Sequence, residues 1–361
     1  MRYPYLITSD QHCHNWSQFA TVGANGVNTR LQIILDELYR AHNVLAENGG
    51  TESFYGGDLF HVRGRIEPSV FNPTFEAIQH IHDTHPALET WAIPGNHDLE
   101  GRDSTSIGNA MQQLAKIDAF HVFTQREIVG DVLVIPWFQD LNDLRNVLSA
   151  YSSKEFEAKS GRKASDLDVI IHAPVNAVIK GIPDHGLEAA ELAAYGFRRV
   201  FAGHYHDYKV MEGGKVISIG ALAHQTWNDP GTKAGFLLVW EDRIEHYPSQ
   251  APQFIDLHKE DVADGELASL VKGNYVRFKI DDVTAAEVNE WRSELEDAGA
   301  IGVSIIATKK RPETTRTGTT VSASKTMESS VAEYVEHLKP DNMAEVQKKC
   351  AELIARARSA A

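Results

Sequence analysis

Short apolar runs, each about the length of a buried strand, alternate with amphipathic segments from Met1 to about Trp240. Two of the amphipathic segments, Thr29–Ala46 and Ser69–His82, repeat their apolar residues at helical spacing. This alternation is typical of an α/β fold, in which strands buried on both faces read as continuous apolar stretches. The strand-like runs are residues 5–7, 53–55, 90–93, 132–135, 169–171, 200–202, 216–219 and 236–240.

Polar motifs rich in Asp, Asn and His lie directly after several of these runs. They are Ser9-Asp10-Gln11-His12, Gly57-Asp58-Leu59-Phe60-His61, Gly95-Asn96-His97-Asp98, His172-Ala173-Pro174 and Gly203-His204-Tyr205-His206. We expect them to meet at one edge of the fold, where strands give way to loops. Their imidazole and oxygen ligands suit manganese, zinc or iron, and the absence of cysteine thiolates argues against a structural zinc site.

Each motif taken alone has an ordinary structural interpretation. A Gly-Asp pair is often a turn, Gly-Asn-His-Asp can be an Asx-turn, and a lone histidine is usually a satisfied core or surface residue. The occurrence of all of them in order, each at a strand end, favours a metal site instead. In Asp10-x-His12 and His204-x-His206, residues two apart on an extended segment point to the same side and can serve one site.

These motifs closely resemble the signature of calcineurin-like metallophosphoesterases. The resemblance implies a four-layer sandwich of two mixed sheets flanked by helices, with a dinuclear metal site between the sheet edges. It implies two divalent ions, with manganese expected and zinc, iron or magnesium as alternatives. The ions would neutralise the attacked phosphate and lower the pKa of a bridging water. By motif, one metal takes Asp10, His12 and His206, the other takes Asn96, His172 and His204, and Asp58 bridges them.

The resemblance also assigns roles to the residues that follow Asn96. His97 is similar to the family histidine that contacts the scissile phosphate and protonates the leaving oxygen, and Asp98 would orient its ring. The alternative for His97 is a supporting residue without proton transfer. His14 adds another imidazole near the site and would contact substrate, unless it is an exposed bystander.

Within this superfamily the chain resembles SbcD-type DNA nucleases. In the motif at residues 57–61, the trailing His61 resembles a histidine that positions the DNA phosphate. Residues 220–235 look like the segment after the last metal motif, although Trp227 and His224 there could be packing residues. The resemblance implies manganese-dependent 3′-to-5′ exonuclease and structure-specific endonuclease activity in DNA repair. The alternatives are a stand-alone phosphodiesterase acting on small or cyclic nucleotides, and a non-catalytic scaffold for an ATPase.

The chain is predicted to have four parts. A nuclease domain covers residues 1–248, and a capping domain that grips DNA covers 249–310, with strands at 275–280 and 302–307 around a helix at 284–298. A flexible linker rich in Thr, Ser and Gly covers 311–325. A helical arm covers 326–361 and is broken near Lys339-Pro340, with apolar residues at helical spacing that could pack on their own domain or on a partner.

Several basic residues are candidate DNA contacts, with solvated surface charge as the alternative for each. These are Arg63, Arg65, Arg102, Lys309 and Lys310. The net charge of -15 argues against a protein that coats nucleic acid electrostatically. We expect the positive charge of bound metal ions and local clusters of basic residues to offset this negative net charge. No base-reading module occurs in the sequence, so recognition of DNA ends or structured duplex is expected.

The sequence and the resemblance also predict partner proteins and a cellular location. No Gly-x-x-x-x-Gly-Lys-Ser/Thr loop occurs, so ATP dependence would come from an SbcC-like coiled-coil ATPase bound by the C-terminal helices. The resemblance also implies a homodimer through Thr29–Ala46 or Ser69–His82. Two separated cysteines fit a reducing compartment. Without a signal or membrane segment, the expected location is the cytoplasm of a bacterium or of a phage-infected cell.

Overall fold

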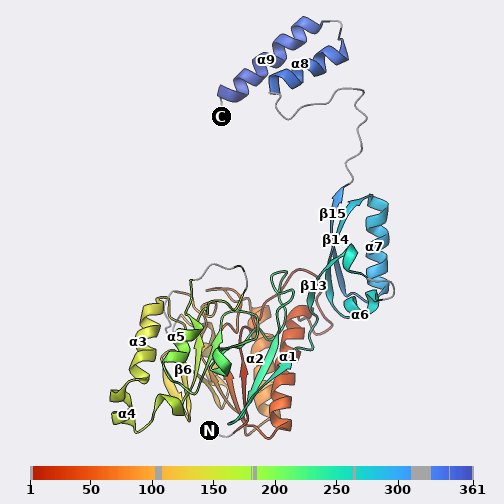
Figure 1. Ribbon diagram of the computed structural model, residues 1–361. Helices are drawn as coiled ribbons and strands as arrows, with labels where there is room; N and C mark the ends of the chain where they lie inside the picture. The colour runs from red at the N-terminus through yellow and green to blue at the C-terminus, as the bar shows by residue number, and fades with distance from the viewer. Residues whose placement is uncertain are drawn as a thin grey trace. The chain divides into compact units, whose positions relative to one another are not determined.

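The computed structural model forms two compact units, residues 1–309 and 310–361, and each is described by itself (Figure 1). The described residues are 3–101, 108–179, 181, 185–262, 266–309, 327–340 and 342–359. The expected linker at 311–325, Arg102 and Lys310 lie outside them.

The first large sheet has six strands in the order β12-β11-β1-β2-β3-β4. Strands β1 to β4 run parallel, whereas β11 pairs antiparallel with both β1 and β12. The sheet is therefore mixed. Its strands are β1 (Tyr5–Thr8), β2 (Glu52–Tyr55), β3 (Glu89–Ala92), β4 (Phe120–Val122), β11 (Gly235–Val239) and β12 (Ile244–Pro248).

The second large sheet also has six strands, in the order β5-β6-β7-β8-β10-β9. Its four central strands are parallel and its two edge strands pair antiparallel. The parallel centre brings the carboxyl ends of β7 and β8 to one edge. Its strands are β5 (Glu127–Val129), β6 (Val132–Ile135), β7 (Asp168–His172), β8 (Arg199–Gly203), β9 (Lys209–Met211) and β10 (Val216–Ser218).

Alternation of side chains along the strands explains the layers. In β1, Tyr5 and Ile7 join a core cluster with residues of the second sheet, whereas Leu6 between them joins a cluster with the helices. All three are fully buried. The two sheets therefore pack face to face, and the predicted four-layer sandwich of mixed sheets and flanking helices is confirmed.

Helices cover the outer face of each sheet. α1 (Thr29–Glu47) and α2 (Pro68–Thr84) bury leucines, isoleucines and valines against the first sheet, close to the predicted helical bounds. α3 (Leu141–Tyr151) and α5 (Ala189–Ala194) cover the second sheet. The remaining helices of this part are α4 (Lys154–Ser160) and the 3-10 turns η1 (Ala110–Lys116), η2 (Ala164–Asp166) and η3 (Glu212–Gly214).

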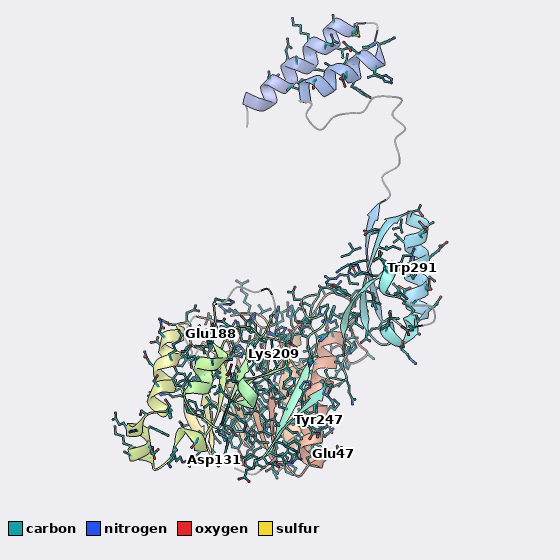
Figure 2. The ribbon with its side chains drawn as sticks, viewed as in Figure 1. Glu47, Asp131, Glu188, Lys209, Tyr247 and Trp291 are labelled. Atoms are coloured by element: carbon teal, nitrogen blue, oxygen red, sulfur yellow. The ribbon has the colours of Figure 1, made fainter. Side chains whose placement is uncertain are left out.

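The small domain (residues 254–309) follows β12, an edge strand of the first sheet, and has its own core. Its three strands are all parallel, in the order β13-β14-β15. A capping box between Thr284 and Glu287 starts α7. Trp291 of that helix, labelled in Figure 2, packs on Phe278 with ring centroids 4.8 Å apart. The elements are β13 (Phe254–His258), η4 (Lys259–Asp261), α6 (Leu267–Val271), β14 (Tyr275–Val283), α7 (Ala285–Asp297) and β15 (Gly302–Lys309).

The second unit contains a helical pair, α8 (Met327–Leu338) and α9 (Met343–Ser359). Val335 is buried between the helices, and α8 ends at Leu338, just before the predicted break at Lys339-Pro340. In the described part of the chain, none of the helices combines the length and apolar character required to cross a membrane.

Candidate metal centre

The predicted ligands gather where the parallel strands of both sheets end. Asp10 and His12 follow β1, Asp58 follows β2, and Asn96 follows β3; from the second sheet, His172 ends β7, and His204 and His206 follow β8. Because both sheets present these strand ends to the same edge, residues far apart in sequence come together. The structure places all seven predicted ligands in one cluster.

The backbone is strained at several of these positions. Asp10, His12, Asp58 and His204 have positive φ angles of 51°, 47°, 56° and 104°, although non-glycine residues rarely adopt this region. Strain of this kind is retained where the surrounding structure fixes a side chain for function. Gly95 leaves room for the Asp58 side chain, because a Cβ at position 95 would lie 2.2 Å from Oδ1 of Asp58.

The first ligand group comprises Asp10, His12 and His206, whose ligand atoms lie within 4.8 Å of one another. One Asp10 oxygen accepts hydrogen bonds from the Ser9 hydroxyl at 2.6 Å and the His204 backbone N–H at 2.9 Å. The other oxygen, Oδ1, is buried, has no hydrogen-bond partner in the described part of the chain and lies 3.8 Å from Nε2 of His12. This unsatisfied oxygen faces the remaining ligands, as expected for a metal ligand.

The second group comprises Asp58, His172 and His204, with the Asn96 amide between the two histidines. The Asn96 side-chain oxygen lies 3.2 Å from Nε2 of His172 and 3.0 Å from Nδ1 of His204. Nδ1 of His172 is 2.8 Å from the Gly56 carbonyl, to which it donates, so Nε2 is left free to bind a cation. The arrangement matches the ligand set expected for the second metal.

Asp58 connects the two groups. Its Oδ2 lies 3.3 Å from Nε2 of His172 and 3.7 Å from Nε2 of His12, and these nitrogens belong to different groups. Its Oδ1 accepts the backbone N–H of His97 at 2.7 Å. One carboxylate therefore faces both ligand groups and also fixes the backbone of His97.

The electrostatics of the cluster favour bound cations. Burial lowers the pKa of His12 well below its usual value and that of His204 to about 3, so both rings keep a free lone pair at neutral pH. Burial also opposes protonation of His172, but Asp58 and Asp10 outweigh it and raise the His172 pKa to about 9. Among the residues that the structure describes, the buried carboxylates of Asp10 and Asp58 have no lysine or arginine partner, so they demand positive charge. The donor set fits a pair of divalent cations.

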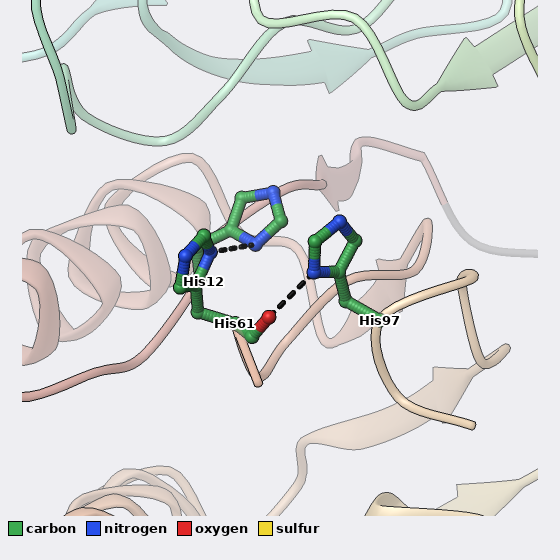
Figure 3. Close-up of side chains that lie close together, drawn as sticks. All are labelled: His12, His61 and His97. Carbon is green, nitrogen blue, oxygen red and sulfur yellow. Dashed lines mark hydrogen bonds between the residues drawn. The ribbon is translucent and has the colours of Figure 1, made fainter. Parts of the chain in front are cut away.

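Two further imidazoles, His61 and His97, lie beside the cluster (Figure 3). Their rings are stacked at a centroid distance of 5.4 Å, and His12 forms a third group with them within 4.8 Å. Nδ1 of His61 lies 3.3 Å from Nδ1 of His12, and Nδ1 of His97 donates to the His61 carbonyl (Figure 3). A hydrogen bond from His12 to His61 accounts for the first contact, because it leaves Nε2 of His12 for the metal ligands.

The structure gives Asp98 a role different from the predicted one. Its carboxylate does not orient the His97 ring, whose Nδ1 is held by the His61 carbonyl. Asp98 instead accepts the backbone N–H groups of Gly95, Asp58, Leu59 and Phe60 at 2.8 to 3.3 Å. Asp98 therefore fixes the backbone of the turn that carries Asp58. Its side chain points toward that turn and away from the His97 ring.

The predicted DNA contacts are only partly described by the structure. His14 lies beside His61, with ring centroids 5.1 Å apart, and it lines a surface pocket of about 300 Å³ together with Arg65. Arg63 and Arg65 are exposed on the loop after His61. The backbone of Lys309 ends β15, and its side chain is not described.

Several residues around the site were not predicted from the sequence. Nδ1 of His206 donates to Asp229 at 2.9 Å, and Trp137 stacks on the His204 ring at 5.5 Å. Gln225 donates to the Asp10 carbonyl at 2.7 Å. The only sequence signal was the family-like segment 220–235, which contains Gln225 and Asp229 but does not reveal which residues face the ligands.

Comparison with known proteins identifies a family for this chain. Residues 3–208 match the family model described as calcineurin-like phosphoesterase. No curated protein matches the sequence. Similar solved structures include a dimetal phosphatase from Danio rerio, with 10% identity, a TM-score of 0.42, and coverage of 67% of this chain and 94% of that chain. Another is the Pseudomonas putida nuclease MPE, with 16% identity, a TM-score of 0.28, and coverage of 65% of this chain and 84% of that chain.

The family match spans all five motifs and all seven clustered residues, and it ends before the loop that holds Asp229. The matched residues, 3–208, make up more than half of the 361-residue chain. The chain belongs to the calcineurin-like phosphoesterase family.

Proposed function

We propose that the chain is a manganese-dependent DNA nuclease with 3′-to-5′ exonuclease and structure-specific endonuclease activity, working in DNA repair with an SbcC-like ATPase. The observation that carries the proposal is the stacked pair His61 and His97 beside the ligand cluster. A phosphodiester expels a sugar alkoxide, which needs a proton donor at the leaving oxygen. His61 and His97 place two imidazoles beside the cluster, in addition to the expected metal ligands.

The residues of the site divide the work of hydrolysis. Divalent ions held by the two ligand groups would supply Lewis acidity toward the phosphate and would activate water. Asp58 holds the backbone of His97, and the His61 carbonyl holds its Nδ1, so Nε2 is left to exchange a proton with substrate. Burial and nearby His14 lower the pKa of His61 to about 4, which keeps this ring neutral at physiological pH. A neutral His61 can position the phosphate by hydrogen bonding.

The local distribution of charge supports DNA as substrate. Arg63 and Arg65 are exposed on the loop that follows His61, although the whole chain has a net charge of -15. Basic side chains near the catalytic groups can contact phosphates on either side of the scissile bond. In the small domain, Arg277 and Lys279 are paired with Asp256 at 2.5 and 3.0 Å, so the loop after His61 is the better candidate for the first phosphate contacts.

A stand-alone phosphodiesterase acting on a small or cyclic nucleotide is the second candidate. The observation that favours it is the excess of acidic residues, 50 Asp and Glu against 35 Lys and Arg. Long polyanions are repelled by such a surface at low salt, whereas a small nucleotide needs only the site itself. Both candidates use the same metal chemistry, so substrate preference separates them.

The deciding experiment follows Mn²⁺-dependent degradation of end-labelled linear duplex DNA, with a cyclic dinucleotide tested in parallel. We expect the wild type to degrade DNA and a 5′-labelled strand to shorten progressively from its 3′ end. His97→Ala should lose about 10²- to 10⁴-fold in rate. His121→Ala is the matched control, because this histidine is about half exposed and pairs with Glu89 on the surface.

The outcomes discriminate between the candidates. Hydrolysis of the cyclic dinucleotide alone would replace the nuclease by the second candidate. Inactivity of the wild type on both substrates, with metal bound, would favour the non-catalytic scaffold unless addition of the ATPase restores cleavage. Equal activity of His97→Ala and wild type would remove His97 from the mechanism. Opposite polarity of shortening would contradict the 3′-to-5′ assignment only.

The helical pair α8 and α9 is proposed as the ATPase-binding element. Tyr334, Leu338 and Leu353 are 56%, 58% and 63% exposed, which leaves apolar surface for a partner. Tyr334→Glu together with Leu338→Glu should abolish copurification with an SbcC-like ATPase while leaving DNA hydrolysis by the isolated chain unchanged. Retained copurification would contradict this assignment. The proposed homodimer through α1 or α2 is tested separately by light scattering of the purified chain.

A further inference from the structure

Arg30 is a nearly buried cation on the first turn of α1. Only 5% of it is exposed, and no carboxylate pairs with it among the residues that the structure describes. Its guanidinium donates to the backbone carbonyls of Gln18 and Gln225. Burial of a charge that contacts only carbonyl groups and ring faces costs folding free energy, which indicates that Arg30 has a role other than stabilising the fold.

Aromatic rings from two domains enclose the Arg30 guanidinium. Its carbon lies 4.9 Å from the Phe254 ring centroid and 5.4 Å from that of Tyr275, which belong to β13 and β14 of the small domain. The third ring, Trp16, belongs to the loop after β1 and lies 5.2 Å away. Arg30 therefore joins the small domain to the nuclease domain through cation–π contacts.

The contact with Trp16 continues to the catalytic side of the site. The Trp16 ring lies 4.5 Å from the ring of His61, which in turn stacks on His97. Asn28 fixes the backbone of Trp16 by donating to its carbonyl at 3.0 Å. Continuous packing thus runs from the small domain through Arg30 and Trp16 to the imidazole pair.

A second branch from Arg30 reaches the metal ligands. Arg30 donates to the Gln225 carbonyl, and the Gln225 side chain donates to the Asp10 carbonyl at 2.7 Å. The same guanidinium therefore contacts a segment that supports Asp10 and a ring that supports His61. No other cation in the described part of unit 1 contacts both Trp16 and the two rings of the small domain.

We infer that Arg30 is a positioning residue that couples the small domain to catalysis by holding Trp16 against His61. A shift of the small domain moves Phe254 and Tyr275, and the guanidinium transmits the shift because it packs between these rings and Trp16. The kinetic part of this inference rests on the proposed phosphodiesterase function. Its structural part, the packing of Trp16 on His61, does not.

Four variants test the inference. Arg30→Met keeps a long apolar stem without the charge, and Trp16→Leu removes the ring that contacts His61. Trp16→Phe keeps an aromatic ring and is the conservative rescue. Arg40→Met is the matched control, because Arg40 also lies on α1 and covers an aromatic ring, Phe236, at 4.8 Å, but makes no contact with Trp16 or the small domain's rings.

The kinetic readout uses bis(p-nitrophenyl) phosphate with Mn²⁺, a diester too small to need grip from the small domain. We expect Arg30→Met and Trp16→Leu to lower kcat about 10- to 100-fold with little change in KM, because a small misplacement of a catalytic group has effects of this size. Trp16→Phe and Arg40→Met should stay within about threefold of wild type by the same reasoning. Circular dichroism and metal content confirm that each variant folds and loads.

The second readout needs no activity. Diethyl pyrocarbonate modifies accessible imidazoles, and peptide mass spectrometry gives the rate at His61 in the metal-free protein. We expect several-fold faster modification of His61 in Arg30→Met and Trp16→Leu, and the wild-type rate in Arg40→Met. Wild-type reactivity of His61 in both folded variants would overturn the inference. A wild type that does not hydrolyse the diester would count against the proposed function, whereas the modification rates would still decide the role of Arg30.

Discussion

Asp229 accepts a hydrogen bond from Nδ1 of His206 at 2.9 Å and so turns Nε2 of that ring toward Asp10 and His12. The other Asp229 oxygen accepts the backbone N–H groups of Gln225 and Thr226 at 2.8 and 2.6 Å, which fixes the carboxylate itself. Carboxylate partners of this kind set the tautomer and basicity of a ligand histidine. Asp229 is thus the rigid support of one ligand in the first group.

Asp229→Asn is expected to weaken Mn²⁺ binding by about 10- to 100-fold. An amide there must keep an oxygen toward the two backbone N–H groups and so presents its NH₂ group to Nδ1 of His206, which is itself a donor. Calorimetric titration of the metal-free protein with Mn²⁺ measures the effect. Asp242→Asn is the control, since that carboxylate is 80% exposed and pairs only with Arg243. Equal affinities of Asp229→Asn and wild type would show that His206 needs no support.

Gly95→Ala is expected to abolish tight Mn²⁺ binding and to lower stability by about 1–3 kcal/mol. The added Cβ would lie 2.2 Å from Oδ1 of Asp58 and 2.5 Å from its backbone nitrogen, so the bridging carboxylate must move. Gly101→Ala is the matched control, because a Cβ at that position meets no atom of the described residues within 4 Å. Urea unfolding and Mn²⁺ titration are measured on both. Unchanged Mn²⁺ affinity of Gly95→Ala would mean that Asp58 tolerates displacement.

The ligand cluster could be predicted from the sequence because its residues follow strands. Parallel strands of one sheet end at one edge, so a polar motif after each strand suffices to place Asp10 near Asp58 in the first sheet and His172 near His204 in the second, without knowledge of distances. The long helices and central strands were predictable for a similar reason, since their apolar periodicity is strong. Short edge strands such as β5 and β9 carry too few residues to show a period.

Residues that act through a neighbour could not be predicted in this way. Arg30 begins an amphipathic helix, where a charged residue is usually solvated, but here Trp16 and two rings of the small domain pack around it. Asp229 lies on a loop 23 residues after His206, and its sequence neighbours give no direction for its side chain. Asp98 was assigned to the wrong partner because adjacency in sequence does not determine which way a loop side chain points.

Asp168→Asn is expected to destabilise the fold by about 3–5 kcal/mol, because it leaves two guanidinium groups without their buried counter-charge. Asp168 is fully buried and accepts hydrogen bonds from Arg198, Arg199 and the Tyr5 hydroxyl at 2.6 to 3.0 Å. These contacts join β1 of the first sheet to β7 and β8 of the second. The free energy of unfolding in urea measures the change.

Asp131→Asn provides the comparison for Asp168. Its carboxylate is 45% exposed and lies 3.7 Å from Arg162, so its loss should change stability by less than about 1 kcal/mol. Similar destabilisation by the two substitutions would contradict a special role for the buried ion pairs. The pKa of Asp168 supports such a role: burial alone would raise it, but the hydrogen bonds from the two arginines outweigh burial and lower it.

His42→Leu is expected to reduce the loss of stability in acid. Burial lowers the pKa of His42 from 6.5 to about 4, while its Nδ1 donates to the Leu38 carbonyl at 2.8 Å. Between these values the unfolded chain binds a proton that the folded chain does not, so stability falls as pH falls, by about 2 kcal/mol from pH 7 to pH 5. The difference in unfolding free energy between wild type and variant should therefore shift by this amount over that range. The exposed His80, replaced in the same way, controls for histidine loss as such. Parallel pH profiles of wild type and His42→Leu would mean that His42 titrates alike in both states, and its burial would then have no part in acid sensitivity.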